Sequence, residues 1–211
     1  NDSVEAAQAA KRLDMLRWRL WMRSLRDGAF VLPGRFDRVI PDLASDWTIT
    51  DEKVYTFRLQ PDQFWHDGRP VTADDVLFTI GILQNPDVVD IPNLAILWRT
   101  VKVEKVDTYS VQFTLSEPFS PFLDYTAIGL LPQHIYGNVP APELASKPLN
   151  GTPIGSGPMM VEAMAADHIR LKPSPFYAGA SPYLSALEFR FYSDHPSLLT
   201  GYMENQIDGV G

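Results

Sequence analysis

The sequence predicts a mixed α/β domain, because segments with the period of a strand and segments with the period of a helix follow one another along the chain. Residues 54–59 alternate between apolar and polar side chains, which is typical of a strand with one buried face. Residues 72–85 repeat their apolar side chains at helical spacing. Between the two, Asp67-Gly68 suits a tight turn. This order of strand, turn and helix indicates a sheet with a helix packed against it.

The strand is expected to bury every second residue. Its apolar positions are Tyr55, Phe57 and Leu59, and Val54, Thr56 and Arg58 fall between them.

Capping signals bound the helix at both ends. Thr72 suits the N-cap, and Asp75 stands three residues later, where it completes the cap and complements the positive end of the helix dipole. Pro86 disfavours helical geometry in Asn85, so the helix is expected to stop there. The apolar face contains Ala73, Val76, Leu77, Ile80 and Leu83.

A hairpin is predicted next, with its turn at Asp107-Thr108. Three valines mark the first arm, and the second arm alternates cleanly, so its odd-numbered side should be buried. These residues are Val101, Val103 and Val106 on the first arm, and Tyr109, Val111, Phe113 and Leu115 on the second.

Toward the C-terminus the pattern returns to strands and one helix. Residues 159–164 and 169–171 can pair, and Leu187, Phe189 and Phe191 alternate in a further strand. Pro196 begins a helix at a position where its missing N–H costs little. That helix has an apolar side made by Leu198, Leu199, Tyr202 and Met203. After it, Asn205 is expected in left-handed geometry.

The amino-acid composition argues against several classes of function and site. The chain has 211 residues, 45% of them hydrophobic, which is enough for a packed core. Its net charge of −8 argues against a general nucleic-acid binder, which neutralises phosphates with Lys and Arg. Without cysteine there can be no disulfide or thiolate metal site. No window approaches the roughly 20 apolar residues that a membrane-spanning helix needs.

The charge is unevenly distributed. Between Lys11 and Arg26 there are six basic residues and one acidic residue, which leaves 12 basic and 25 acidic residues elsewhere. Residues 3–26 also show helical spacing with a broad apolar side, so a basic amphipathic helix is expected. Docking of its apolar side on its own domain is favoured over binding to anionic lipid or a partner.

Several ordered motifs follow one another along the chain, beginning with PDLASDW at 41–47, YTFRL at 55–59 and WHDGRPVTADDV at 65–76. They resemble those of the family-5 solute-binding proteins of ABC importers, which include peptide- and nickel-binding receptors. Later segments are similar to the family as well, at 117–123, 153–158 and 206–208. In PIGSGP and the residue that follows it, the family's usual Thr and Tyr are replaced by Ser156 and Met159. Such a series is more specific than a lone short motif.

The resemblance implies a fold and a division into domains. It indicates the first lobe of a type II periplasmic binding protein, with the second lobe absent. Residues 1–35 and 150–211 would form the core of this lobe. Residues 36–149 would form a smaller inserted α+β subdomain.

The resemblance also implies a function. The chain would be part of a substrate-binding component that captures peptides or similar small solutes outside the cytoplasmic membrane, at its periplasmic or extracytoplasmic face. Its partners would be the solute and the permease subunits of the transporter, with no nucleic acid, and the membrane would be reached only through the transporter or a lipid anchor. No enzyme activity, cofactor or metal is expected. Segments near the cleft between lobes would contact the solute, namely Trp98, Ile128, Gly129, Leu130, Gly155, Ser156 and Gly157.

Two alternatives remain open. A hydrolase-like enzyme would need a nucleophile and a base brought together from distant positions, such as Ser156 and His168. An interaction module would act through the basic N-terminal helix, with Arg17, Arg19 and Arg23. The four histidines are scattered without ligand spacing, so metal binding by side chains has little support.

Overall fold

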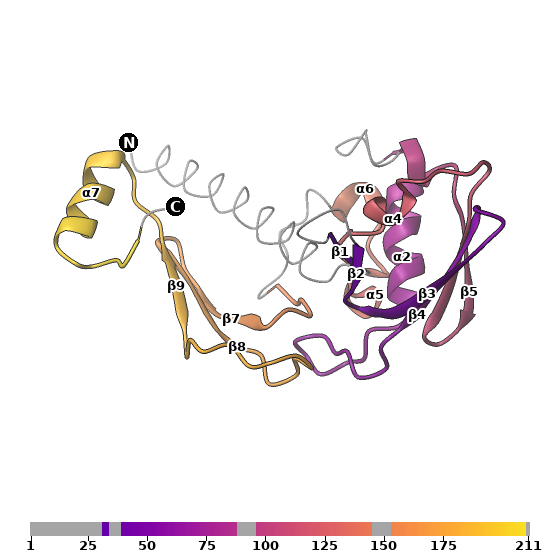
Figure 1. Cartoon of the computed structure of the whole chain (residues 1–211). Coiled ribbons are helices and arrows are strands. Elements are labelled where there is room, and N and C mark those ends of the chain that lie inside the picture. Colours follow the sequence, from indigo (N-terminus) through magenta and orange to yellow (C-terminus); the bar gives the residue numbers. More distant parts are fainter. Residues whose placement is uncertain (1–30, 34–38, 88–95, 145–152, 210–211) are drawn as a thin grey trace.

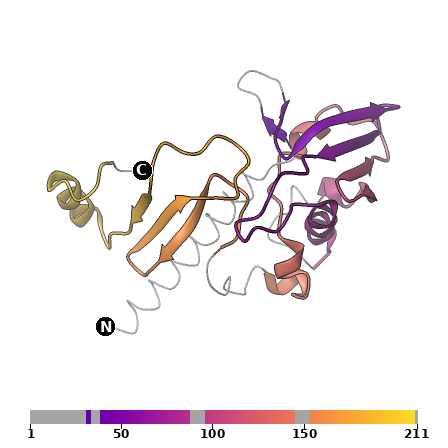
Figure 2. The same ribbon diagram turned by 90° about the horizontal axis from the view of Figure 1, so that it is seen from below.

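The structure is a computed structural model that describes residues 31–33, 39–87, 96–144 and 153–209. Its elements form two groups, which Figure 1 and Figure 2 show side by side. We refer to the described residues between 31 and 144 as the α2 unit. Residues 153–209 are the β7–β9 unit. Strands and helices occur in both, so the predicted mixed α/β class is confirmed.

The α2 unit is built on a four-stranded antiparallel sheet in the order β3-β4-β6-β5, and α2 packs against it (Figure 1). The strands are β3 (Ala44–Thr50), β4 (Val54–Leu59), β5 (Lys102–Asp107) and β6 (Ser110–Thr114). A short hairpin pairs β1 (Val31–Pro33) with β2 (Val39–Pro41). The helices are α2 (Ala73–Gln84), α4 (Phe122–Tyr125), α5 (Gln133–Tyr136) and α6 (Ala141–Leu144).

The strand and helix predicted at the centre of this unit are confirmed. β4 buries Tyr55, Phe57 and Leu59, as the alternation requires. α2 has Thr72 as its N-cap and Asn85 as its C-cap, and Thr72 and Asp75 form a capping box. The strand β3, which pairs with β4, was not predicted.

The predicted hairpin is confirmed, with β5 and β6 pairing antiparallel. Val111, Phe113 and Leu115 are buried on the second arm. On the first arm the register between β5 and β6 shifts between Lys105 and Asp107, and Val106 is 57% exposed. A bulge adds a residue to one strand, so the alternation of the faces is interrupted there.

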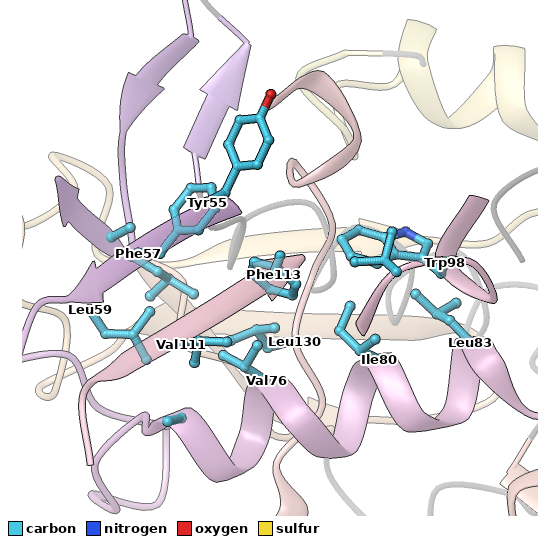
Figure 3. Packing of buried hydrophobic residues seen from close by; sticks show 14 of the residues in the cluster. Tyr55, Phe57, Leu59, Val76, Ile80, Leu83, Trp98, Val111, Phe113 and Leu130 are labelled. Carbon is cyan, nitrogen blue, oxygen red and sulfur yellow. The ribbon is translucent and has the colours of Figure 1, made fainter. Parts of the chain in front are cut away.

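Aromatic rings fill the core between the sheet and α2 (Figure 3). Phe113 lies 5.6 Å from Trp98 and 5.8 Å from Phe122 between ring centroids, and Tyr55 lies 4.7 Å from Phe122. The two pairs that Phe113 makes are edge-to-face, which adds to the stabilisation from burial. Gln84 holds the chain beside Trp98 through Nε2, which donates to the Trp98 and Val101 carbonyls at 2.9 and 2.7 Å.

The β7–β9 unit is a three-stranded antiparallel sheet followed by a helix. Its elements are β7 (Met159–Met164), β8 (His168–Pro173), β9 (Leu187–Arg190) and α7 (His195–Met203). The predicted pairing of residues 159–164 and 169–171 is confirmed. So is the left-handed conformation of Asn205, whose φ is 56°.

The apolar side predicted for α7 is largely exposed among the described residues. Leu199 is 51% exposed, Tyr202 50% and Met203 79%. On β9, Leu187 and Phe189 are each 37% exposed. The β7–β9 unit therefore has little apolar burial of its own.

Two predictions concern residues that the structure does not describe in full. The amphipathic helix over 3–26 lies outside the described residues. The division into a core of 1–35 with 150–211 and an inserted subdomain at 36–149 therefore stays a prediction.

Candidate functional site

The candidate site is organised by the tight turn that precedes α2. Trp65 N–H donates to the Arg69 carbonyl at 2.7 Å, and Phe64 pairs with Pro70 in an isolated bridge. Gly68 has φ +81°, a left-handed conformation that glycine adopts without strain. The turn places the side chain of His66, which is 7% exposed, toward the β7–β9 unit.

Three hydrogen bonds join His66 to the segment 155–157, and we call them the His66 junction. The His66 N–H donates to the Gly155 carbonyl at 2.7 Å. The Gly155 N–H donates to His66 Nδ1 at 3.2 Å. His66 Nε2 lies 2.9 Å from the Gly157 carbonyl oxygen. One buried imidazole thus connects two segments that are about 90 residues apart in the sequence.

Asp75 is a second buried polar centre, in the first turn of α2. Its Oδ2 accepts hydrogen bonds from Thr72 N–H at 2.9 Å and from Trp65 Nε1 at 3.3 Å. Its Oδ1 accepts from Gln133 N–H at 2.8 Å. The carboxylate therefore caps its own helix and also fixes the start of α5.

Thr79, one turn along α2, holds the neighbouring part of the same loop. Its hydroxyl donates to the Asp75 carbonyl at 2.7 Å and accepts from Leu131 N–H at 2.9 Å. Two polar side chains on the buried side of α2 therefore bind the backbone at residues 131 and 133.

Asp67 and His134 link the turn to α5. Asp67 Oδ2 lies 2.7 Å from His134 Nε2, and Asp67 Oδ1 accepts from Arg69 N–H at 3.2 Å. The turn is thus tied to α5 on one side and to the segment 155–157 on the other.

Burial and hydrogen bonding shift the pKa values at this site in different directions. Burial lowers the pKa of His66 below its ordinary value, because the charged imidazolium loses solvation. Burial raises the pKa of Asp75, and the hydrogen bonds from Thr72, Gln133 and Trp65 offset part of that rise. For Asp67 burial is the largest single effect and raises the pKa, but the hydrogen bonds from His134 and Arg69 together outweigh it, so the pKa is lowered.

The predicted solute-binding residues fall into three places. Gly155, Ser156 and Gly157 are buried beside His66. Gly129 and Leu130 are buried, and the half-buried Ile128 packs against the core. These six positions lie on the two backbone segments that hydrogen bonds from the turn and from α2 fix in place. The seventh predicted residue, Trp98, lies elsewhere.

Trp98 lies inside the aromatic core and is 0% exposed. Its ring packs against Phe113 and Phe122, so in this structure it serves the core. From the sequence, Trp98 was expected to contact the solute.

The roles of Asp75, Thr79 and His66 in joining segments were missed. A signal for the first two is present in the sequence, because Asp75 and Thr79 are polar residues on the apolar face of an otherwise amphipathic helix. His66 was expected only as part of the motif at 65–76. No local pattern indicates a partner about 90 residues away.

Two features of the described residues concern metal ligands and membrane-spanning helices. Within them, no three His, Cys, Asp or Glu side chains cluster as metal ligands would. None of the described helices has the length and apolar character needed to cross a membrane.

Comparison with known proteins gives a consistent result. The family model described as bacterial extracellular solute-binding proteins, family 5, middle region, matches residues 38–211. A dipeptide-binding protein of Escherichia coli is 30% identical over 181 residues, covering 74% of this chain and 33% of its own length. The oligopeptide-binding protein AppA of Bacillus subtilis is 34% identical over 148 residues, covering 67% of this chain and 26% of its own length.

Solved structures are similar over most of the chain. NikZ from Campylobacter jejuni, in complex with Ni(L-His), has a TM-score of 0.74 at 28% identity, covering 88% of this chain and 37% of that one. AppA from Bacillus subtilis, in complex with a nonapeptide, has a TM-score of 0.76 at 25% identity, covering 87% and 37%. This chain spans about a third of the length of the curated relatives that it matches.

Proposed function

This chain belongs to family 5 of the bacterial extracellular solute-binding proteins, and we propose that it forms part of the first lobe of a receptor for an ABC importer. The receptor would capture peptides or similar small solutes outside the cytoplasmic membrane and present them to the permease subunits. The family is one of transport proteins that bind solutes. Peptides are favoured as the solute because relatives in two bacteria are named for binding them.

One observation carries the proposal: buried hydrogen bonds fix the two backbone segments predicted to contact the solute. His66 fixes the segment 155–157, while Asp75 and Thr79 fix residues 131 and 133 next to the segment 128–130. Backbone that is ordered before binding loses less entropy when the solute arrives. Backbone N–H and C=O groups also complement those of a peptide.

The mechanism proposed is closure of two lobes around the solute. Contacts from both lobes favour the closed state over the open one, and a single lobe supplies only part of them. We therefore expect weak or undetectable peptide binding by these 211 residues, and tight binding by a receptor that also carries the second lobe. Isothermal calorimetry with a set of di- to nonapeptides tests both. Sub-micromolar affinity of the 211-residue chain alone would contradict the proposal.

A pair of variants in the two-lobed receptor tests the segment itself. Ser156→Leu places bulk in the buried loop, and we expect at least a tenfold loss of affinity, equivalent to about 1.4 kcal/mol. Ser120→Leu makes the same change at an exposed position and should leave affinity unchanged. Equal affinities for the two variants would remove segment 155–157 from the solute site.

The hydrolase alternative gains no support from the histidines near its proposed residues. His66 is the histidine beside Ser156, and both of its ring nitrogens contact backbone groups. His168, the base considered from the sequence, has Nδ1 2.9 Å from Asp167 Oδ1 on the exposed end of β8. A general base must reach its nucleophile, and among the described residues no hydrogen bond joins either ring to the Ser156 hydroxyl.

The interaction-module alternative concerns residues outside the described part. It stays a prediction, tested by changing Arg17, Arg19 and Arg23 to Glu. Unchanged retention on anionic vesicles or on the partner would dismiss it.

A further inference from the structure

The hydrogen bonds of the His66 junction require one tautomer of the ring. Because the Gly155 N–H donates to Nδ1 at 3.2 Å, Nδ1 must carry a lone pair. The proton of the neutral imidazole then sits on Nε2, 2.9 Å from the Gly157 carbonyl, to which it donates. The ring thus satisfies one donor and one acceptor of the same segment.

Protonation of the ring would break this arrangement. In the imidazolium both nitrogens carry hydrogen, so Nδ1–H would face the Gly155 N–H, donor against donor. The ring is 7% exposed, so water cannot readily replace the lost acceptor. A buried donor left without an acceptor costs about 1–3 kcal/mol.

The charged groups around the ring come from the turn and from two helices. Asp67 follows His66 in the chain and favours the charged form through its carboxylate. It is itself engaged with His134 of α5 at 2.7 Å. Asp75 of α2 contacts the neighbouring Trp65. The segment 155–157 contributes no titratable side chain.

We propose that His66 is the positioning residue for the segment 155–157, and that only its neutral imidazole holds this segment against the α2 unit. Mild acid then releases the segment, together with the attachment of the β7–β9 unit. The junction itself is independent of the solute. The consequence that acid also weakens solute binding rests on the proposed function.

The sign of the pH dependence follows from the lowered pKa of His66. Between the folded pKa and the ordinary value of about 6.5, the released state binds more protons than the joined state. The junction is therefore fully formed above that value and weakens as the pH falls through it. Below the ordinary pKa the His66 ring is protonated in the released state and still neutral in the joined state. In this range, each pH unit of further acidification lowers the ratio of joined to released molecules about tenfold, until the folded pKa of His66 is reached.

Nuclear magnetic resonance on the 211-residue chain, labelled with ¹⁵N, tests this directly. At neutral pH we expect His66 with the proton on Nε2 and a Gly155 amide protected from hydrogen exchange. On acidification through the ordinary histidine range, the protection factor of Gly155 should fall together with the His66 titration. A neutral ring protonated on Nδ1, or a Gly155 amide whose protection ignores the His66 titration, would overturn the proposal.

Two variants separate positioning from mere packing. In His66→Asn the amide oxygen can occupy the place of Nδ1, so Gly155 should stay at least partly protected and lose its pH dependence. In His66→Gln the amide nitrogen can reach only toward the Gly157 carbonyl, and Gly155 protection should fall at least tenfold at neutral pH. His195→Gln changes an exposed histidine on α7, and it should alter neither the protection of the Gly155 amide nor its pH dependence. Retained pH dependence at Gly155 in His66→Asn would sink the proposal.

Peptide affinity of the two-lobed receptor, measured against pH, distinguishes the two levels of inference. If acid weakens peptide binding by the parent receptor but not by His66→Asn, both the pH-dependent junction and the proposed role of segment 155–157 in solute binding are supported. If the Gly155 amide is released and affinity does not follow, the junction stands and the proposed role of segment 155–157 in solute binding fails.

Discussion

The two units of this chain are stabilised in different ways. The α2 unit buries Trp65, Trp98, Phe57 and Phe113 almost completely. In the β7–β9 unit, Ile169 is the only hydrophobic residue that is buried among those described. What the second unit has instead is strand pairing, ion pairs on an exposed face and the His66 junction. A region with little apolar burial depends on its polar attachment, so it is expected to open first.

The comparison is tested most severely by removing one large ring from each unit. Phe113→Ala leaves a cavity in the core and should lower the free energy of unfolding by about 3–5 kcal/mol. Phe189→Ala removes a ring that is already 37% exposed and should cost less than half as much. Urea titration followed by tryptophan fluorescence measures both. Equal losses would show that the units do not differ in this way.

Removing Asp75 tests whether polar groups matter inside the apolar unit too. Asp75→Ala deprives three donors of their acceptor, from Thr72, Trp65 and Gln133, and should cost on the order of 3 kcal/mol. Asp74→Ala is the matched control on the next residue, where the carboxylate forms an exposed ion pair with Lys105 at 2.8 Å. That variant should lose at most about 1 kcal/mol. A loss for Asp75→Ala no larger than the control would contradict the role assigned to it.

A methyl group at Gly68 would sharpen the boundary between the units. The left-handed backbone costs a non-glycine residue about 1–2 kcal/mol. A Cβ there would also lie 3.0 Å from Cε1 of Phe176, which belongs to the other unit. Gly68→Ala should therefore speed limited proteolysis of the β7–β9 unit. Adding Phe176→Ala removes the contact but not the strain, so partial recovery is expected, whereas full recovery would assign the whole effect to the ring.

The smallest effect is expected from the ion pairs on the sheet β7–β9. Arg170 lies 2.9 Å from Glu162 and 3.5 Å from Glu188, and its side chain is 48% exposed. Arg170→Ala should change stability by no more than about 1 kcal/mol. The difference should shrink further in ~1 M salt, where screening acts within about 3 Å. A larger loss that persists in salt would mean that these charges hold the unit together.

The sequence predicted correctly those features that depend on interactions between residues close together in the chain. The alternation in 54–59, the capping signals at Thr72 and Asn85 and the left-handed Asn205 all depend on neighbours within a few residues. The exposure of Val106 could not be predicted in this way, because a single bulge, invisible in the alternation, shifts the register between β5 and β6.

The site was predicted only in part, since its geometry depends on contacts between distant segments. Gly155, Ser156 and Gly157 were picked from a family motif, but nothing near them points to His66 as their partner. Trp98 lies in the core because rings from β6 and α4 surround it, and those neighbours are fixed by the fold and not by its own segment.

The span of the His66 junction sets an order of folding. A ribosome makes the chain from its N-terminus, so the last strand and helices of the α2 unit emerge before Gly155 does. We therefore expect the imidazole to be seated in its turn, with the core behind it closed, before its partner has left the ribosome. Closing a loop of 89 residues onto a prepared site costs chain entropy once, and the cost grows only slowly with loop length. The late arrival of the glycine segment is thus the step at which a nascent chain joins its two halves.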